Sequence, residues 1–259
     1  MSLSLVPHPL YLCALILNVA SFVAFRRMEK LIDQRREKCE KYFAANGVRI
    51  RNWYKFNNLL ISFIHSIIAS VGSLIILLQH PTLCWDFVHE FHLLAYLFPC
   101  LSCGYFVADL LTNIVKRKLF NRSWKDCSEI IVHHFVVTTD LLIAQSYMQY
   151  VGGLMTALLA EVNNIFLHLR SFLILLDVPI GSGSSHIWIT HSNLITSLLF
   201  RCFPLVLITY RFTFDLPNLY PDIPELDLFM VTISLLLLFT YKNALTWRIV
   251  RRDYRALLA

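Results

Sequence analysis

Seven long apolar stretches dominate this sequence, and each is about the length of a membrane-spanning helix. They cover roughly residues 5–25, 56–78, 93–115, 130–148, 153–176, 187–211 and 226–247. A helix needs roughly 20 apolar residues to cross about 30 Å of hydrocarbon. Transmembrane β-strands are shorter and alternate in polarity. The pattern therefore predicts an all-α integral membrane protein with about seven transmembrane helices.

The composition excludes an ordinary soluble domain. The chain is 57% hydrophobic and only 15% charged, and its mean hydropathy is +0.58. Soluble domains are roughly half apolar and about a quarter charged. Basic residues follow the first apolar stretch rather than precede it, so we expect a retained span and not a cleaved signal peptide.

Positive charge predicts the direction of the spans. Ten Lys and Arg residues lie between Arg26 and Lys55, five lie between Lys116 and Lys125, and more follow Lys242. The connections at 79–92 and 215–227 contain none. Cytosolic loops are enriched in Lys and Arg, so the N-terminus is expected outside and the C-terminus in the cytosol. The net charge of +6 belongs to this cytosolic face, where it could also attract anionic headgroups or the phosphates of an acyl-CoA. Binding to nucleic acid is not expected of so deeply embedded a chain.

Polar side chains recur inside five of the spans at helical spacing. Residues three, four and seven apart share one helix face, so polar residues at this spacing form a polar stripe along the helix. The five polar stripes are Asn58, Ser62 and His65; Ser102, Tyr105, Asp109 and Thr112; His133 and Asp140; Glu161, Asn164, His168 and Ser171; and Asn193, Ser197 and Arg201. The stripes are expected to face one another around a shared polar cavity. A helix kink is expected at Pro204.

The ionisable members of these stripes fall at similar depths. With a rise of ~1.5 Å per residue, His65, Asp109, His133 and His168 lie about 10–15 Å inside the cytosolic ends of their spans. Glu161 and Arg201 lie nearer the midplane and are expected to pair, because an unpaired charge there costs several kcal/mol. We therefore predict a cavity in the cytosolic half, with six substrate-binding candidates: His65, Asp109, Glu161, Asn164, His168 and Arg201.

His133 and His134 are the catalytic candidates. A histidine can act as a general base or nucleophile in acyl transfer, or it can bind a lipid headgroup through hydrogen bonds. No His-x4-Asp motif is present, since Asp140 lies six or seven residues beyond the pair. We predict no metal and no cofactor, because His89 and His92 fall on the external side, too far from the pair to share a metal ion. Cys100-x-x-Cys103 lies in an apolar span and predicts packed cysteines.

Four stretches of the sequence resemble the TLC domain family. They read NWYKFNNLLISFIHS, CGYFVADLL, SWKDCSEIIVHHF and GGLMTALLAEVNNIFLHLRSF, and the resemblance covers about residues 47–254. It is greatest to the small type 1 and type 2 TLC-domain-containing proteins, which have a His pair after a Trp-containing loop and a Glu-Val-x-Asn-Ile-Phe-Leu run after a Gly-Gly turn. Here these are His133-His134 after Trp124 and Glu161–Leu167 after Gly152-Gly153.

The resemblance implies two parts of the chain. Residues 1–46 would form an N-terminal transmembrane helix and a basic cytosolic segment. Residues 47–259 would form the TLC domain, with six transmembrane helices around the polar cavity and a basic C-terminal tail. The resemblance further implies a multi-pass location in the plasma membrane, with the endoplasmic reticulum as the other possibility.

The resemblance also implies a function. The similar proteins limit the incorporation of long-chain polyunsaturated fatty acids into phospholipids, and so regulate phospholipid acyl composition and membrane fluidity. The expected partners are membrane lipids, either phospholipid or acyl-CoA. One alternative is an acyltransferase, of ceramide-synthase type or acting on glycerophospholipids; a second is a lipid transporter. Whether the protein is an enzyme stays open. Ceramide synthases share the His pair, but their fifth-span motif carries a histidine and an aspartate where this chain has Ala160 and Asn164.

The charge pattern generates a test of topology. Asn121-Arg122-Ser123 is the only Asn-x-Ser/Thr sequence of the chain, and its basic connection is expected in the cytosol. Because glycosylation of this motif requires a lumenal position, Asn121 should remain unmodified in cells. A glycosidase-sensitive shift in mass that disappears in Asn121→Gln would overturn the predicted direction.

Overall fold

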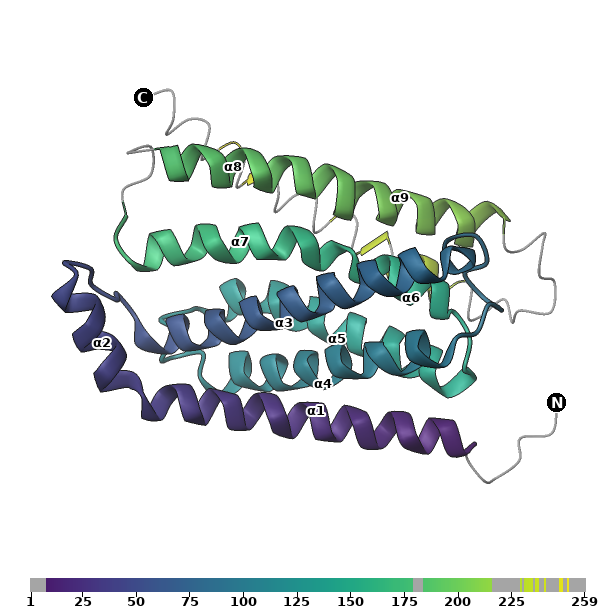
Figure 1. Cartoon of the computed structure of the whole chain (residues 1–259), viewed down its shortest axis with the longest axis horizontal. Coiled ribbons are helices and arrows are strands. Elements are labelled where there is room, and N and C mark those ends of the chain that lie inside the picture. Colours follow the sequence, from purple (N-terminus) through teal and green to yellow (C-terminus); the bar gives the residue numbers. More distant parts are fainter. Residues whose placement is uncertain are drawn as a thin grey trace.

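The computed structural model describes residues 8–178 and 184–215, together with isolated positions between 229 and 251. These residues form helices and no strands (Figure 1). The α-helices are α1 (Pro9–Gln34), α2 (Arg36–Ala45), α3 (Trp53–Gln79), α4 (Leu93–Val115), α5 (Trp124–Tyr147), α6 (Val151–Leu158), α7 (Ala160–Leu175), α8 (Ser184–Ser197) and α9 (Phe203–Tyr210). A 3-10 helix, η1 (Pro81–Cys84), and two π-helical segments, η2 (Leu198–Cys202) and η3 (Arg211–Asp215), complete the described elements. The expected all-α fold is confirmed.

Six described stretches are long and apolar enough to cross a membrane. They are α1, α3, α4, α5, the pair α6–α7 (Val151–Leu175), and Ile187–Phe214, which runs from α8 to η3. The chain is therefore a multi-pass membrane protein. The seventh expected span, at 226–247, lies largely outside the described residues.

Two helices extend beyond the apolar residues of their spans. The helix α5 begins at Trp124, six residues before the apolar stretch at 130–148. Ser123 and Asp126 form a capping box there, in which each side chain accepts a hydrogen bond from the other residue's backbone N–H. Similarly, α1 continues through the basic residues to Gln34. Hydropathy marks the part of a helix inside hydrocarbon, whereas the capping box decides where α5 begins.

The Gly-Gly pair lies inside α6 rather than in a turn. The turn between α5 and α6 uses positive φ angles at Met148 and Tyr150. Gly152 is needed for a close approach, because an added Cβ would lie 2.2 Å from the carbonyl oxygen of Leu83 in η1. The sequence predicts a kink at Pro204, and the structure has the π-helical segment η2 directly before α9. Pro204 then lies in the first turn of α9, where a missing N–H is tolerated.

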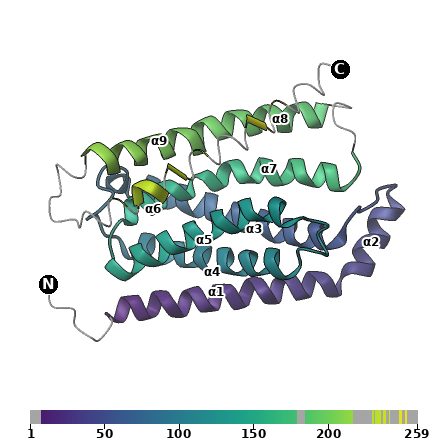
Figure 2. The same ribbon diagram turned by 180° about the vertical axis from the view of Figure 1, so that it is seen from behind.

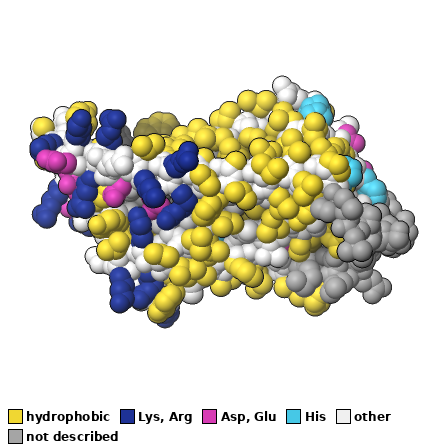
Figure 3. All heavy atoms as spheres, turned by 90° about the horizontal axis from the view of Figure 1, so that it is seen from below, with side chains coloured by type: hydrophobic (Ala, Val, Ile, Leu, Met, Phe, Trp, Pro, Cys, Tyr) yellow, Lys and Arg dark blue, Asp and Glu magenta, His cyan; other side chains and the backbone are white. Residues whose placement is uncertain are grey.

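The bundle has α1 at one edge and α8–α9 at the opposite edge, with α3, α4, α5 and α7 between them (Figures 1 and 2). Lys and Arg side chains gather at one end, next to a broad hydrophobic band, His side chains lie toward the other end, and acidic side chains are present at both ends (Figure 3). The connections from α1 to α3 and from α4 to α5 lie at the basic end. This is the distribution that the positive-inside rule requires of cytosolic connections.

Small and amide side chains hold α1 against the bundle. A Cβ added to Gly104 of α4 would lie 2.5 Å from the carbonyl oxygen of Asn18 and 2.6 Å from the backbone nitrogen of Phe22. Membrane helices approach most closely where such small residues meet. Asn18 also donates a hydrogen bond to Gln145 of α5, with 2.8 Å between Nδ2 and Oε1. Both α4 and α5, which carry the site described below, are thus fixed to α1.

The close contact at Gly104 predicts a sensitive position. The change Gly104→Val should lower the free energy of unfolding by about 1–3 kcal/mol, because α1 and α4 must separate. Thermal unfolding of the purified protein in detergent measures the effect. Leu111→Val is the control, since Leu111 lies on α4 with 42% of its surface exposed. Equal melting temperatures for the two variants would contradict this packing.

Candidate functional site

A polar cavity of about 510 Å³ lies between α3, α4, α5 and α7. The ionisable and amide side chains that line it are Lys55, Asn58, Asp109, Asn113, Arg122, His133, His134, Glu161, Asn164, His168 and Arg170. Its outer end is at Lys55 and Arg122, beside the basic connections. Of the eight candidates named from the sequence, the structure brings six to this wall: Asp109, His133, His134, Glu161, Asn164 and His168.

Asp109 is a buried carboxylate that several donors surround. Asn58 donates to Oδ1 at 2.9 Å, and Asn113 donates to Oδ2 at 2.8 Å. The Nδ1 atom of His134 lies 3.0 Å from the same Oδ2, so the carboxylate can orient this ring. Only 7% of Asp109 is exposed. A carboxylate at such a position is costly unless donors surround it, and here they come from α3, α4 and α5.

The two adjacent histidines face different surroundings. Successive residues of a helix point about 100° apart, and the ring centroids of His133 and His134 are 5.2 Å apart. His134 contacts Asp109 and lines only the polar cavity. His133 lines both the polar cavity and a second, apolar cavity. The His134 ring is therefore held by the Asp109 carboxylate, while the His133 ring lies between the polar and the apolar cavity.

Glu161 belongs to a network that reaches the sixth described span. It accepts hydrogen bonds from Ser66 Oγ at 2.7 Å and from Asn164 Nδ2 at 2.8 Å. Arg201 donates to the side-chain oxygen of Asn164. Asn164 therefore links Glu161 and Arg201, the two residues that the sequence expects to pair.

His65 stands behind the cavity wall. It is fully buried, it stacks on Tyr105 with ring centroids 3.8 Å apart, and its Nε2 lies 3.0 Å from Ser102 Oγ. Its Nδ1 is 3.7 Å from Glu161. His65 is not among the residues lining either cavity described here. Its position supports the wall through Tyr105 and Glu161.

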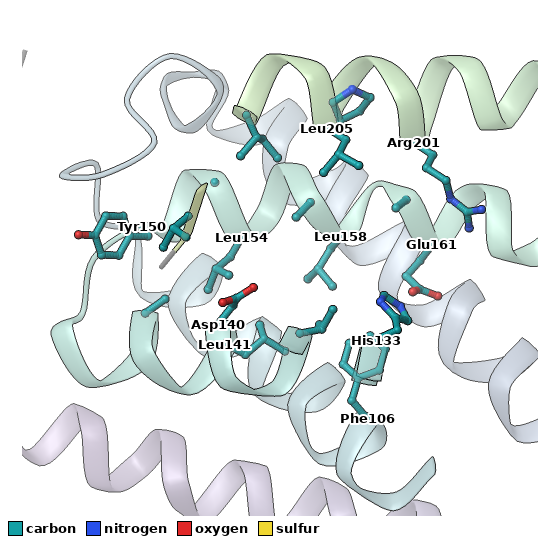
Figure 4. Close-up of a pocket in the computed structure, with 18 of the residues that line it drawn as sticks. Phe106, His133, Asp140, Leu141, Tyr150, Leu154, Leu158, Glu161, Arg201 and Leu205 are labelled. Carbon is teal, nitrogen blue, oxygen red and sulfur yellow. The ribbon is translucent and has the colours of Figure 1, made fainter. Parts of the chain in front are cut away.

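The second cavity is apolar and has a volume of about 150 Å³. Leu141, Tyr150, Leu154, Leu158 and Leu205 surround it, His133, Glu161 and Arg201 lie at one end, and Asp140 is a carboxyl group in its wall (Figure 4). It shares Phe106, His133, Glu161 and Asn164 with the polar cavity. Arg201, which the sequence assigned to the polar stripes, lines this second cavity. The two cavities therefore meet at the depth of His133.

Sequence reasoning missed part of this arrangement. Asn113 and Arg122 line the polar cavity, although neither belongs to a stripe that the sequence singled out. The spacing of four residues between Asp109 and Asn113 was an available signal, since it puts both on one helix face. No sequence signal indicated the apolar cavity, because a leucine that lines a cavity cannot be told from a leucine that faces lipid by sequence.

The described part of the chain contains no group of three or more His, Cys, Asp or Glu side chains that could hold a metal ion.

The model of the TLC domain matches residues 55–251, which is most of the chain. The chain belongs to the TLC domain family. It is 37% identical to TLC domain-containing protein 2 of Danio rerio over 123 residues, which cover 48% of each chain. It is 31% identical to TLC domain-containing protein 1 of Homo sapiens over 166 residues, or 63% of each chain. With TLC domain-containing protein 1 of Gallus gallus it shares 31% identity over 195 residues, which cover 75% of this chain and 71% of that relative.

The matched segment thus spans about half of the zebrafish relative and less than two thirds of the human one. No solved structure matches the chain.

The donors around Asp109 predict a stability effect. In Asp109→Asn an NH₂ group replaces one acceptor oxygen and therefore faces one of the two donors, Asn58 or Asn113. The free energy of unfolding should fall by about 1–3 kcal/mol, the cost of leaving a buried donor unsatisfied. Glu37→Gln, which removes one negative charge from an exposed ion pair on α2, should change it by less than about 1 kcal/mol. Thermal unfolding in detergent measures both effects. Equal melting temperatures for the two variants would show that the Asp109 carboxylate does not need the surrounding donors.

Proposed function

We propose that this protein regulates the acyl composition of membrane phospholipids, and thereby membrane fluidity, by limiting the incorporation of long-chain polyunsaturated fatty acids into phospholipids. The observation that supports the proposal most strongly is the junction of the two cavities at Phe106, His133, Glu161 and Asn164. An acylated lipid has the same two parts, a polar headgroup and an apolar chain, with a carbonyl group between them.

The junction suits the carbonyl end of an acyl chain. A neutral imidazole both donates and accepts a hydrogen bond, so His133 can hold an ester or amide at the boundary. The chain itself would lie among Leu154, Leu158 and Leu205, where it exchanges lipid surroundings for a shaped apolar wall. Membership in the TLC domain family supports a lipid-related role, and the type 1 and type 2 relatives support phospholipids as the class of lipid. The plasma membrane is the proposed location.

A second candidate function is acyl transfer. The observation that favours it is the contact between His134 and Asp109, next to His133 at the junction. A carboxylate that orients a histidine is a common arrangement in general-base catalysis. His133 or His134 would then accept the proton of an attacking hydroxyl or amine as its oxygen or nitrogen bonds to the acyl carbon. The same histidine would return that proton to the oxygen or sulfur of the acyl donor as the old acyl bond breaks. Ala160 and Asn164 weigh against a ceramide-synthase type of reaction and leave a glycerophospholipid as the better substrate.

Lipidomics of cells that lack the protein tests the proposal. Phospholipids should gain long-chain polyunsaturated acyl groups while ceramides stay unchanged, and the wild-type protein should reverse the gain. At least one of His133→Asn and His134→Asn should fail to reverse it at normal protein abundance. Changed ceramides would support the ceramide-synthase reading instead, and unchanged lipids would leave transport as the better explanation. Full rescue by both single variants and by the double variant would make the pair structural.

A bulky residue in the apolar cavity tests where the acyl chain lies. Leu205→Trp should fill the space beside Leu154 and Leu158, and it should reproduce the lipid profile of cells that lack the protein. The matched control is Val206→Trp, because Val206 is the next residue of α9, is 51% exposed and does not line the cavity. The control should restore a normal profile. Equal rescue by both variants would place the acyl chain elsewhere.

A further inference from the structure

The outer end of the polar cavity carries two cations. Lys55 belongs to the first turn of α3, and Arg122 stands in the connection between α4 and α5. Both line the cavity, and the charge of Arg122 acts on Lys55. Two positive charges in one partly buried space repel each other, and an anion between them removes that cost.

The charge of Asp126 acts on both cations, but this carboxylate is exposed and already holds the cap of α5. Asp126 accepts hydrogen bonds from the backbone and the hydroxyl of Ser123 in the cap of α5. Asp109 accepts from Asn58 and Asn113. Within the described residues, the Lys55 ammonium has no carboxylate at ion-pair distance. The cavity has a volume of about 510 Å³, which leaves room for an additional anion beside Lys55 and Arg122.

Arg122 is held in a position from which it can bind that anion. One of its N–H groups donates to Asn113 Oδ1 at 2.8 Å, and the guanidinium group lies 5.7 Å from the ring centre of Phe120. Arginine has five donors in a rigid plane, and this geometry matches the oxygens of a phosphate. Lysine adds a compact charge beside it. Asn113 also donates to Asp109, so the same side chain links the outer cation to the histidine site.

The distance between the cations and the histidines limits the kind of ligand. Asn58 is three residues beyond Lys55 on α3, a rise of about 4.5 Å. Asn58 contacts Asp109, which contacts His134. A group bound at Lys55 therefore lies about one helical turn from the level of the histidines. In a glycerophospholipid only a few bonds separate the phosphate from the acyl esters, whereas in an acyl-CoA a long arm separates the phosphates from the acyl thioester.

We infer that Lys55 and Arg122 form a subsite for the phosphate of a glycerophospholipid. This inference rests on the proposed function, because it assumes that the acyl chains of the same lipid occupy the apolar cavity. The phosphate binds at the outer end, the glycerol esters lie beside His134 and His133, and one acyl chain continues into the apolar cavity.

Lipid titrations of the purified full-length chain in detergent test the subsite. The probes are a phosphatidylcholine and a diacylglycerol with the same two acyl chains, and binding is followed by intrinsic fluorescence. The wild type should bind the phospholipid more tightly than the diacylglycerol. The double variant Lys55→Gln/Arg122→Gln should lose about tenfold or more in affinity for the phospholipid alone, since charge-assisted contacts of this kind are worth at least one decade.

Two further variants complete the design. Lys118→Gln/Lys125→Gln removes the same charge from exposed positions nearby that do not line the cavity, and it should bind as the wild type does. Lys55→Arg/Arg122→Lys keeps both charges and should retain most of the preference for phospholipid. This variant distinguishes an effect of lost charge from an effect of misfolding.

Each outcome decides something specific. Unchanged phospholipid affinity in Lys55→Gln/Arg122→Gln, or equal wild-type affinities for the two lipids, would overturn the subsite and leave the acyl cavity intact. Loss of both affinities in Leu205→Trp supports the acyl cavity independently of the subsite. A wild type that binds neither lipid would overturn both. If the double variant loses affinity for an acyl-CoA but not for the phospholipid, the assignment to a glycerophospholipid is wrong.

Discussion

The rest of the site depends on the burial of the Asp109 carboxylate inside a membrane-spanning bundle. Such a group is tolerated only if donors satisfy its oxygens. Asn58 of α3, Asn113 of α4 and His134 of α5 supply them. The same contacts therefore stabilise the charge, join three helices and fix the orientation of one histidine. Helix geometry then turns the neighbouring His133 toward the junction of the two cavities.

The junction gives the bundle an internal polarity like that of a lipid. Polar and charged side chains surround the outer cavity, and leucines surround the inner one. The network from Ser66 through Glu161 and Asn164 to Arg201 lies where they meet, and it ties α3, α7 and η2 together. A lipid held in this way would have its acyl linkage next to two histidines. Regulation of acyl composition and acyl transfer both need that placement.

The helical spans could be predicted from sequence because each contains nearly enough apolar residues to cross a bilayer. Polar stripes likewise predicted that Asp109, His133 and Glu161 would converge, since spacing fixes helix faces. The C-terminal end of α1 and the start of α5 could not be predicted from hydropathy, because α1 continues through basic residues and a capping box begins α5 before its apolar stretch. His65 shares a stripe with Asn58, yet its ring is stacked behind the wall on Tyr105. The apolar cavity depends on how side chains from α5, α6, α7 and α9 pack together, and no single segment carries a signal for it.

The central claim is that an acyl chain of a phospholipid occupies the apolar cavity. Photo-crosslinking tests it directly, with a phosphatidylcholine that carries a diazirine near the end of one acyl chain. The labelled residues of the purified protein are then mapped by mass spectrometry, with and without an excess of unlabelled phosphatidylcholine. The account predicts competed labelling at Leu154, Leu158 or Leu205, which line the cavity. Labelling confined to exposed positions such as Ile195 and Val206, with no competition, would show that the chain stays in the surrounding lipid and would contradict the account.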